Sequence, residues 1–332
     1  MRPLILPNRK RGSGPSFSHK GRRVGGGALA VWLAGLLLLV GAQALAAQPD
    51  WNSPGDNLAP DPAVRFGSLP NGLHYAILKH NSPPHEVSLR LRIAAGALQE
   101  APDQDGVAHM LEHMAFRGSA HVRDGEVWKT LARLGVSFGA DSNAYTTPSQ
   151  TYYQFDLPNG GAGGTDIGLL LLRDIASELN LTPEALDDER KVVLSEARLT
   201  DSPSVQADLD RTAFWFDGQP TAQRGPMGDL DTIRRLTAAQ LRAYYGAYYR
   251  PERATLVIVG DVDPDAVEVQ IWARFSDWAG KGPAGPDPVI TPPSDRGLKV
   301  RAFVQPGAPS SITLAWLAPF SHGPRPWPTS SC

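Results

Sequence analysis

Two histidines and a glutamate lie close together in an otherwise apolar stretch of the sequence. The segment from Gly106 to Ser119, GVAHMLEHMAFRGS, contains His109, Glu112 and His113 among mostly apolar side chains. In a helix, His113 lies about 40 degrees round from His109 and Glu112 about 60 degrees to the other side, so all three share one face. A buried polar group without a hydrogen-bond partner costs about 1 to 3 kcal/mol, and a charge costs more. These side chains therefore need partners.

The spacing H-x-x-E-H predicts a zinc site. Two neutral imidazoles one helical turn apart can bind a single metal ion, and the carboxylate beside them can act on the water that the metal carries. The pattern is the inverse of H-E-x-x-H and is typical of inverted zincins. The alternative is a pair of core histidines bonded to backbone carbonyls, with Glu112 in an ion pair. A chance match is rare in a chain with eight histidines, which favours zinc.

A third protein ligand must come from another element, because a catalytic zinc site uses three protein ligands and a water. The predicted helix TPEALDDERKVVLSEARL carries Glu189 and Glu196 seven residues apart, hence about 20 degrees apart around its axis. Both carboxylates lie on the apolar face of this helix, where each needs a cation or hydrogen-bond donors. An arginine can satisfy a single glutamate in such a place. The spacing alone does not decide which glutamate binds the metal.

Strand patterns and helix patterns mix along the chain without a strict βαβ alternation. Apolar-polar alternation and turn residues predict strands within residues 66–78, 87–93 and 136–158. Helical periodicity and capping residues predict helices from residue 106, over 124–133, over 165–215 with a break at 180–184, and over 237–249 and 264–278. The run RATLVIVGDVD predicts a strand buried on both faces. We therefore expect an α+β fold, one sheet with helices packed on one face.

Positive charge is concentrated at the amino-terminal end. The first 49 residues hold seven Lys or Arg and no Asp or Glu, and they include the run ALAVWLAGLLLLV followed by Ala-Leu-Ala. This order is typical of a secretory signal, so residues 1–47 are expected to be a signal peptide and the protein to be periplasmic or secreted. An uncleaved membrane anchor through residues 28–46 is the alternative, although the apolar run is short for a span. The rest of the chain has no basic stripe, which argues against a nucleic-acid partner.

Proline and glycine indicate a boundary near the carboxyl end. Residues 58–280 are expected to form the zinc-peptidase domain, and residues 281–297 are dense in Pro and Gly, as linkers are. Residues 298–332 begin with two strand-like segments, LKVRAFVQPG and SSITLAWLAP, that no predicted helix covers. Two strands do not form a stable domain alone, so we interpret them as the truncated start of a second α+β domain.

The motifs together resemble the pitrilysin/insulinase family of zinc peptidases, which includes the mitochondrial processing peptidase. The resemblance covers about residues 66–319 and rests on seven segments in the same order: LPNGLHY, AAGALQE, GVAHMLEHMAFRGS, NAYTTPSQTYY, ERKVVLSEA, LRAYYGAYYRPERATLVIVGDVD and ITLAW. It implies the metallohydrolase fold of the mitochondrial processing peptidase, one bound Zn2+ ion and metalloendopeptidase activity.

The resemblance also implies a role for each residue of the motifs. His109, His113 and Glu196 would bind the zinc. Glu112 would be the general base that takes a proton from the attacking water. Glu189 would be an outer carboxylate that orients a ligand histidine.

The stretch SNAYTTPSQTYY resembles the edge strand that holds the substrate in this family. There, Asn143 and the backbone near Ala144 would bind an extended peptide by strand addition. Main-chain pairing recognises a peptide's shape rather than its sequence, so unfolded or short peptides are the expected substrates. The alternative is an ordinary hairpin in which Asn143 serves a turn.

Three functions are compatible with this sequence. The first is an exported zinc endopeptidase, or the catalytic N-terminal portion of a longer one. The second is a non-catalytic peptide-binding or partner subunit, although such members of the family usually lose motif residues and all five are present here. The third is an inactive truncated product. Family members build a half from two such units, so a second copy or a partner subunit is expected to supply the missing half. The later family region that gives an Arg and a Tyr to the transition state is not in this sequence, which puts oxyanion stabilisation in question.

Overall fold

The computed structural model describes residues 60–137, 139, 141–290 and 297–316. The predicted signal peptide, residues 1–47, and the alternative anchor, residues 28–46, lie outside these described residues. Within them, every helix is too short or too polar to span a membrane.

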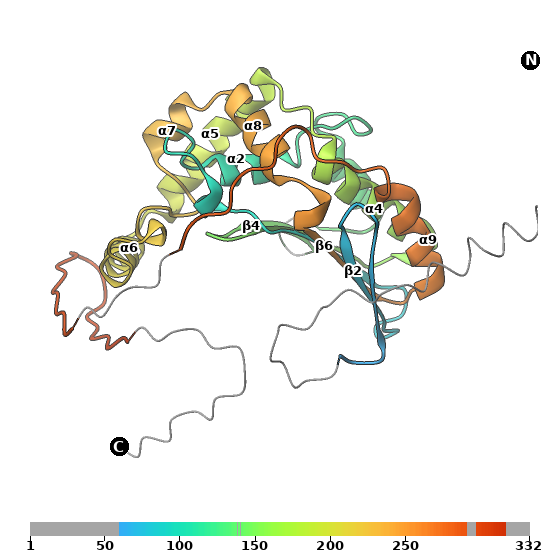
Figure 1. Cartoon of the computed structure of the whole chain (residues 1–332), viewed down its shortest axis with the longest axis horizontal. Coiled ribbons are helices and arrows are strands. Elements are labelled where there is room, and N and C mark those ends of the chain that lie inside the picture. The colour runs from blue at the N-terminus through green and yellow to red at the C-terminus, as the bar shows by residue number, and fades with distance from the viewer. Residues whose placement is uncertain (1–59, 138, 140, 291–296, 317–332) are drawn as a thin grey trace, which may run out of the picture. The chain divides into compact units, whose positions relative to one another are not determined.

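The described residues form a mixed six-stranded sheet against which helices pack (Figure 1). Its strand order is β1-β2-β6-β3-β5-β4, and only β2 and β6 pair in parallel. The strands are β1 (Val64–Ser68), β2 (His74–Lys79), β3 (Val87–Ile93), β4 (Ser142–Thr146), β5 (Thr151–Leu157) and β6 (Ala254–Gly260). Strand β4 is an edge strand, because β5 is its only neighbour among the described strands.

Helices cover one face of this sheet. Figure 1 shows α2, α4, α5, α8 and α9 on the same side of the strands. The helices are α2 (Val107–Met114), α3 (Val127–Arg133), α4 (Gly161–Ser177), α5 (Pro183–Thr200), α6 (Pro203–Trp215), α7 (Leu230–Arg235), α8 (Ala238–Tyr248) and α9 (Pro264–Phe275). Short 3-10 turns are η1 (Ala97–Gln99), η2 (Pro220–Ala222) and η3 (Pro251–Arg253). The predicted α+β fold with helices on one face is confirmed.

Side-chain alternation in the central strands follows from this one-sided cover. In β5, Tyr153 and Phe155 are fully buried beneath the helices, whereas Tyr152 and Gln154 on the other face are only half-buried. The same alternation occurs in β6, where Leu256 is buried and its neighbours are half-buried. The prediction that this strand is buried on both faces was therefore wrong, because no helix among the described residues lies over its second face.

Local capping signals set the helix ends that the sequence predicts. The hydroxyl of Thr182 accepts a hydrogen bond from the N–H of Ala185 at 3.2 Å, and Pro183 opens α5. Thr237 and Gln240 form a capping box at the start of α8. The helical block predicted over residues 165–215 has a second break, where Ser202 caps α6. The sequence patterns did not predict this break.

The segment expected to start a second domain forms no strand in residues 297–316. Most of its large apolar side chains are exposed, with Leu298 and Ile312 both at 95%. A strand needs a neighbour for its backbone hydrogen bonds, and within the described residues no other strand pairs with this segment. The apolar alternation of the two predicted strands is therefore present in the sequence but not realised as a sheet.

Candidate metal centre

Helix α2 brings the two histidines and the glutamate of the H-x-x-E-H motif into the interior. It packs against α5, α8 and β4. His109 and Glu112 are 8% and 9% exposed, and His113 is half-buried. The ring centroids of the two histidines are 4.8 Å apart, so one helical turn places the imidazoles side by side, as the spacing predicts.

A carboxylate from α5 meets both imidazoles. Glu196 Oε2 lies 3.1 Å from His113 Nε2 and 3.8 Å from His109 Nε2. Two zinc ligands at tetrahedral angles and ordinary bond lengths are about 3.4 Å apart, and the two observed separations lie on either side of this value. One ligand atom from each of the three residues lies within 4.8 Å of the others. The donor set, two nitrogens and one carboxylate oxygen, therefore fits a zinc ion.

The second glutamate of α5 lies on the far side of one imidazole. His113 Nδ1 donates a hydrogen bond to Glu189 Oε1 at 2.9 Å, while its Nε2 faces Glu196. Glu189 is buried, and an Arg117 nitrogen lies 3.7 Å from its second oxygen. The geometry thus separates two carboxylates that their spacing along the helix could not tell apart. Glu196 faces the space between the histidines, and Glu189 orients one ring from behind.

The surroundings of the two imidazoles shift their pKa values in opposite directions. Burial lowers the pKa of His109 to about 4, and the neighbouring His113 adds to this effect. Burial also opposes a charge on His113, but hydrogen bonds with Glu189 and Glu196 outweigh it and raise the pKa of that ring to about 9. The hydrogen bond with His113 lowers the pKa of the Glu196 carboxyl. Neutral His109 and ionised Glu196 are in the states that bind a metal ion, whereas a charged His113 must first lose its Nε2 proton.

The carboxylate of Glu112 has a partner that the sequence analysis missed. The hydroxyl of Thr146, the last residue of β4, donates a hydrogen bond to Glu112 Oε2 at 2.5 Å. Burial raises the pKa of Glu112, although the bond from Thr146 acts in the other direction. Thr146 lies within the motif SNAYTTPSQTYY, but only the folded chain brings it to α2.

The start of α2 is held by a glutamate from outside the helix. Gly106 precedes the helix with a left-handed φ of 95 degrees and supplies no side-chain cap. Glu100 instead accepts hydrogen bonds from the N–H groups of Gly106 and Ala108, both at 2.9 Å. The Glu100 side chain is buried. Its hydrogen bond with Ala108 holds the backbone of the helix one residue before His109.

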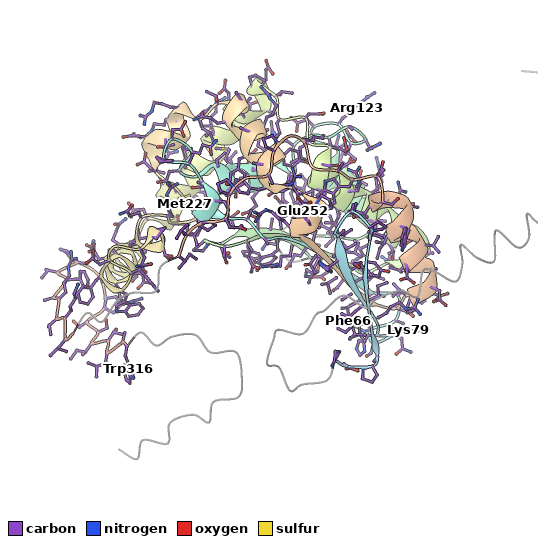
Figure 2. The ribbon with its side chains drawn as sticks, in the orientation of Figure 1. Phe66, Lys79, Arg123, Met227, Glu252 and Trp316 are labelled. Carbon is purple, nitrogen blue, oxygen red and sulfur yellow. The ribbon has the colours of Figure 1, made fainter. Side chains whose placement is uncertain are left out.

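A cavity of about 610 Å³ opens onto the motif residues. Phe116 and Trp128 form one apolar wall, with ring centroids 4.8 Å apart and nearly parallel planes. Met227 contributes to another wall, and Figure 2 shows it beside α2. Its loop lies against the helix start, because a Cβ added to Gly228 would be 2.2 Å from the Cα of Gly106. Sequence patterns predicted neither wall, since Trp128 and Met227 come from elements far from the motif.

The residues expected to hold a peptide line the same cavity. Asn143 and Ala144 lie in the edge strand β4, where Asn143 pairs with Gln154 of β5, so Asn143 does not serve a turn. Its Oδ1 accepts a hydrogen bond from the N–H of Ala144 at 2.9 Å, and its Nδ2 donates to the Tyr145 hydroxyl at 2.6 Å. All seven predicted site residues therefore line the cavity: His109, Glu112, His113, Asn143, Ala144, Glu189 and Glu196.

Comparison with known protein families gives two matches along the chain. Residues 75–222, which contain all seven predicted site residues, match the model described as Insulinase (Peptidase family M16). Residues 235–329 match the model described as Peptidase M16 inactive domain.

Curated relatives of this chain are named as zinc proteases. The probable zinc protease PqqL of Haemophilus influenzae is 34% identical over 215 residues, which is 65% of this chain and 23% of that protein. The protein of the same name from Escherichia coli is 33% identical over 231 residues, 70% of this chain and 24% of its own length. The chain thus spans about a quarter of the length of these two relatives.

The fold is also similar to that of a solved structure. The first half of the periplasmic protease PqqL from Escherichia coli superposes with a TM-score of 0.65 at 31% identity, over 69% of this chain and 49% of that one. Fold, family models and relatives agree: the chain belongs to the insulinase family of peptidases, family M16.

Proposed function

We propose that this chain carries the catalytic unit of a zinc-dependent endopeptidase that hydrolyses unfolded or short peptides. The observation that carries the proposal is the meeting of His109, His113 and Glu196 within 4.8 Å, with the carboxylate of Glu112 in the same cavity. Two relatives are named as probable zinc proteases, and these names support the choice of metal and of reaction.

In this proposal the three ligands would hold one Zn2+ ion, which supplies a Lewis acid that polarises the peptide carbonyl and makes water more acidic. Glu189 keeps His113 in the tautomer whose Nε2 faces Glu196, because Nδ1 carries the proton that it donates. Glu112 accepts a proton from the attacking water and later delivers it to the leaving nitrogen of the peptide. The burial that raises the pKa of Glu112 favours such a proton transfer near neutral pH.

The substrate is proposed to bind along β4 as an added strand. Asn143 and the backbone of Ala144 would contact its main chain, and the edge position of β4 leaves room for such pairing. The stacked rings of Phe116 and Trp128 favour an apolar substrate side chain on that side of the cavity.

The proposed cellular setting and organisation follow the sequence pattern. We propose an exported protein, periplasmic or secreted, with residues 1–47 as its signal or residues 28–46 as an anchor. The similar structure from Escherichia coli is described as a periplasmic protease, which supports export. Residues 58–280 would be the catalytic domain, 281–297 a linker and 298–332 the start of a second domain. A second copy or a partner subunit would supply the missing half.

Zinc content and peptide cleavage test the proposed function together. The purified chain should contain about one zinc per molecule and cleave a quenched, unfolded peptide. Glu112→Gln should keep the zinc and lose the cleavage, because the amide cannot accept the proton. Zinc and peptide binding without any cleavage would instead favour a peptide-binding subunit. A chain that binds no zinc would contradict the proposal.

A further inference from the structure

Glu112 depends on one residue for its hydrogen bonds. Within the described part of the chain, the hydrogen bonds to its carboxylate come from Thr146, whose hydroxyl lies 2.5 Å from Oε2. The backbone N–H of Thr146 also lowers the pKa of the same carboxyl group. Because Glu112 is 9% exposed, water replaces these bonds poorly.

A buried glutamate needs such a partner to keep one orientation. The last torsion of a glutamate side chain is broad, so the carboxylate rotates unless a hydrogen bond fixes it. Thr146 fixes Oε2 and leaves Oε1 as the oxygen available to a proton from water. A base must be aligned with the proton that it accepts, and a misplacement of about 1 Å lowers rates by about 100-fold.

The sheet holds Thr146 in place independently of the helix. Thr146 pairs with Thr151 of β5 in the antiparallel register. The hydroxyl of Thr151 in turn donates to the carbonyl of Ala95 at 3.1 Å, so the partner residue is itself anchored. The bond to Glu112 therefore joins a residue positioned by the sheet to a residue positioned by α2.

We infer that Thr146 is a positioning residue that aligns Glu112 and ties it to the strand on which a peptide would add. The inference rests on the proposed function for its catalytic part. Ala144 and Thr146 lie on the same strand, so one stretch of backbone sets both the register of an added peptide and the direction of the base. The strand to which a peptide would add thus sets the orientation of the Glu112 carboxylate, together with the helix that carries Glu112.

Kinetics of matched variants test the catalytic part. Thr146→Val keeps the shape and removes the hydroxyl, so kcat should fall about 10-fold or more, with KM within about 3-fold and zinc content unchanged. Thr146→Ser keeps a hydroxyl and should restore kcat to within about 3-fold of the wild type. Thr255→Val, the same change on the half-buried face of β6, should leave kcat within about 2-fold, because Thr255 is not among the residues that line the cavity.

Urea unfolding of the metal-free chain tests the contact without any activity. Thr146→Val alone should lower the urea midpoint, since it leaves a buried carboxylate without its hydroxyl donor. In a Glu112→Leu background the same change should leave the midpoint unchanged or raise it, because both partners are then apolar. The difference between the two backgrounds measures the coupling.

Three results would overturn the inference: equal midpoint changes in both backgrounds, an unchanged kcat in Thr146→Val, or a Thr146→Ser variant as slow as Thr146→Val. A wild-type chain that binds no zinc and cleaves nothing would instead contradict the proposed function. The unfolding cycle then still decides whether Thr146 holds Glu112, so the two failures are distinguishable.

Discussion

The helical half of the candidate site and its strand half use different parts of the chain. In the helical half, α2 and α5 bring imidazoles and carboxylates within hydrogen-bond distance of one another, and the side chains are the functional groups. In the strand half, β4 lies at the edge of the sheet, where a peptide would pair with its backbone, and most side-chain types are compatible with that task. Apart from Thr146, whose hydroxyl contacts Glu112, substitutions should therefore be severe in the helical half and mild in the strand half.

The largest effect is expected at Glu196. Glu196→Gln removes the charged ligand that faces both histidines, so zinc binding and peptide cleavage should fall together, cleavage by about 1000-fold or more. Metal analysis and kinetics at fixed zinc concentration measure both. Retention of full zinc content by this variant would break the distinction between the two glutamates of α5.

A smaller loss is expected at Glu189, which touches His113 from behind. Glu189→Gln keeps a hydrogen-bond acceptor but removes the charge, so zinc affinity should fall about 10- to 100-fold. Competition with a zinc chelator measures the affinity. Glu184→Gln is the matched control, because Glu184 is exposed on the same helix and the change should leave the affinity unchanged. Equal losses in the two variants would contradict a specific role for Glu189.

The buried cap of α2 should make stability depend on pH. Burial raises the pKa of Glu100 to about 8 in the folded chain. The protonated carboxyl group therefore contributes to stability in full below the pKa of the unfolded chain, and this contribution is lost as the pH rises through the pKa of the folded chain. At about 1.4 kcal/mol for each pKa unit, the loss between pH 5 and 9 is on the order of 4 kcal/mol. Urea unfolding across this range measures it. Glu100→Gln should flatten the dependence, whereas a change of the exposed Glu184 to Gln should not.

The mildest effect is expected in the strand half. Asn143→Ala should raise KM about 3- to 10-fold for a long peptide and leave kcat and zinc content unchanged, since the backbone of β4 still pairs. Gln154→Ala, at the paired position on β5, serves as control. A lower KM in Asn143→Ala would reverse the interpretation, because the Asn143 side chain would then be covering the N–H of Ala144 rather than binding the substrate.

The sequence predicted the features that depend on neighbours along the chain. The turn of α2 that aligns His109 with His113, and the caps Thr182 and Thr237, involve residues within a few positions of one another. The strand predicted over residues 298–307 shows the limit of such patterns. Its alternation is correct for a strand, but no partner pairs with it in the described residues, and it stays exposed.

The sequence by itself determined the α+β class, the helix that carries the H-x-x-E-H motif and the two glutamates able to complete it, because periodicity and capping are local properties. Only the tertiary structure decided that Glu196 faces both histidines while Glu189 supports one, that Thr146 reaches Glu112, and that Phe116 meets Trp128 at the cavity wall. These contacts join residues from separate elements, and the packing of helices against the sheet sets their distances.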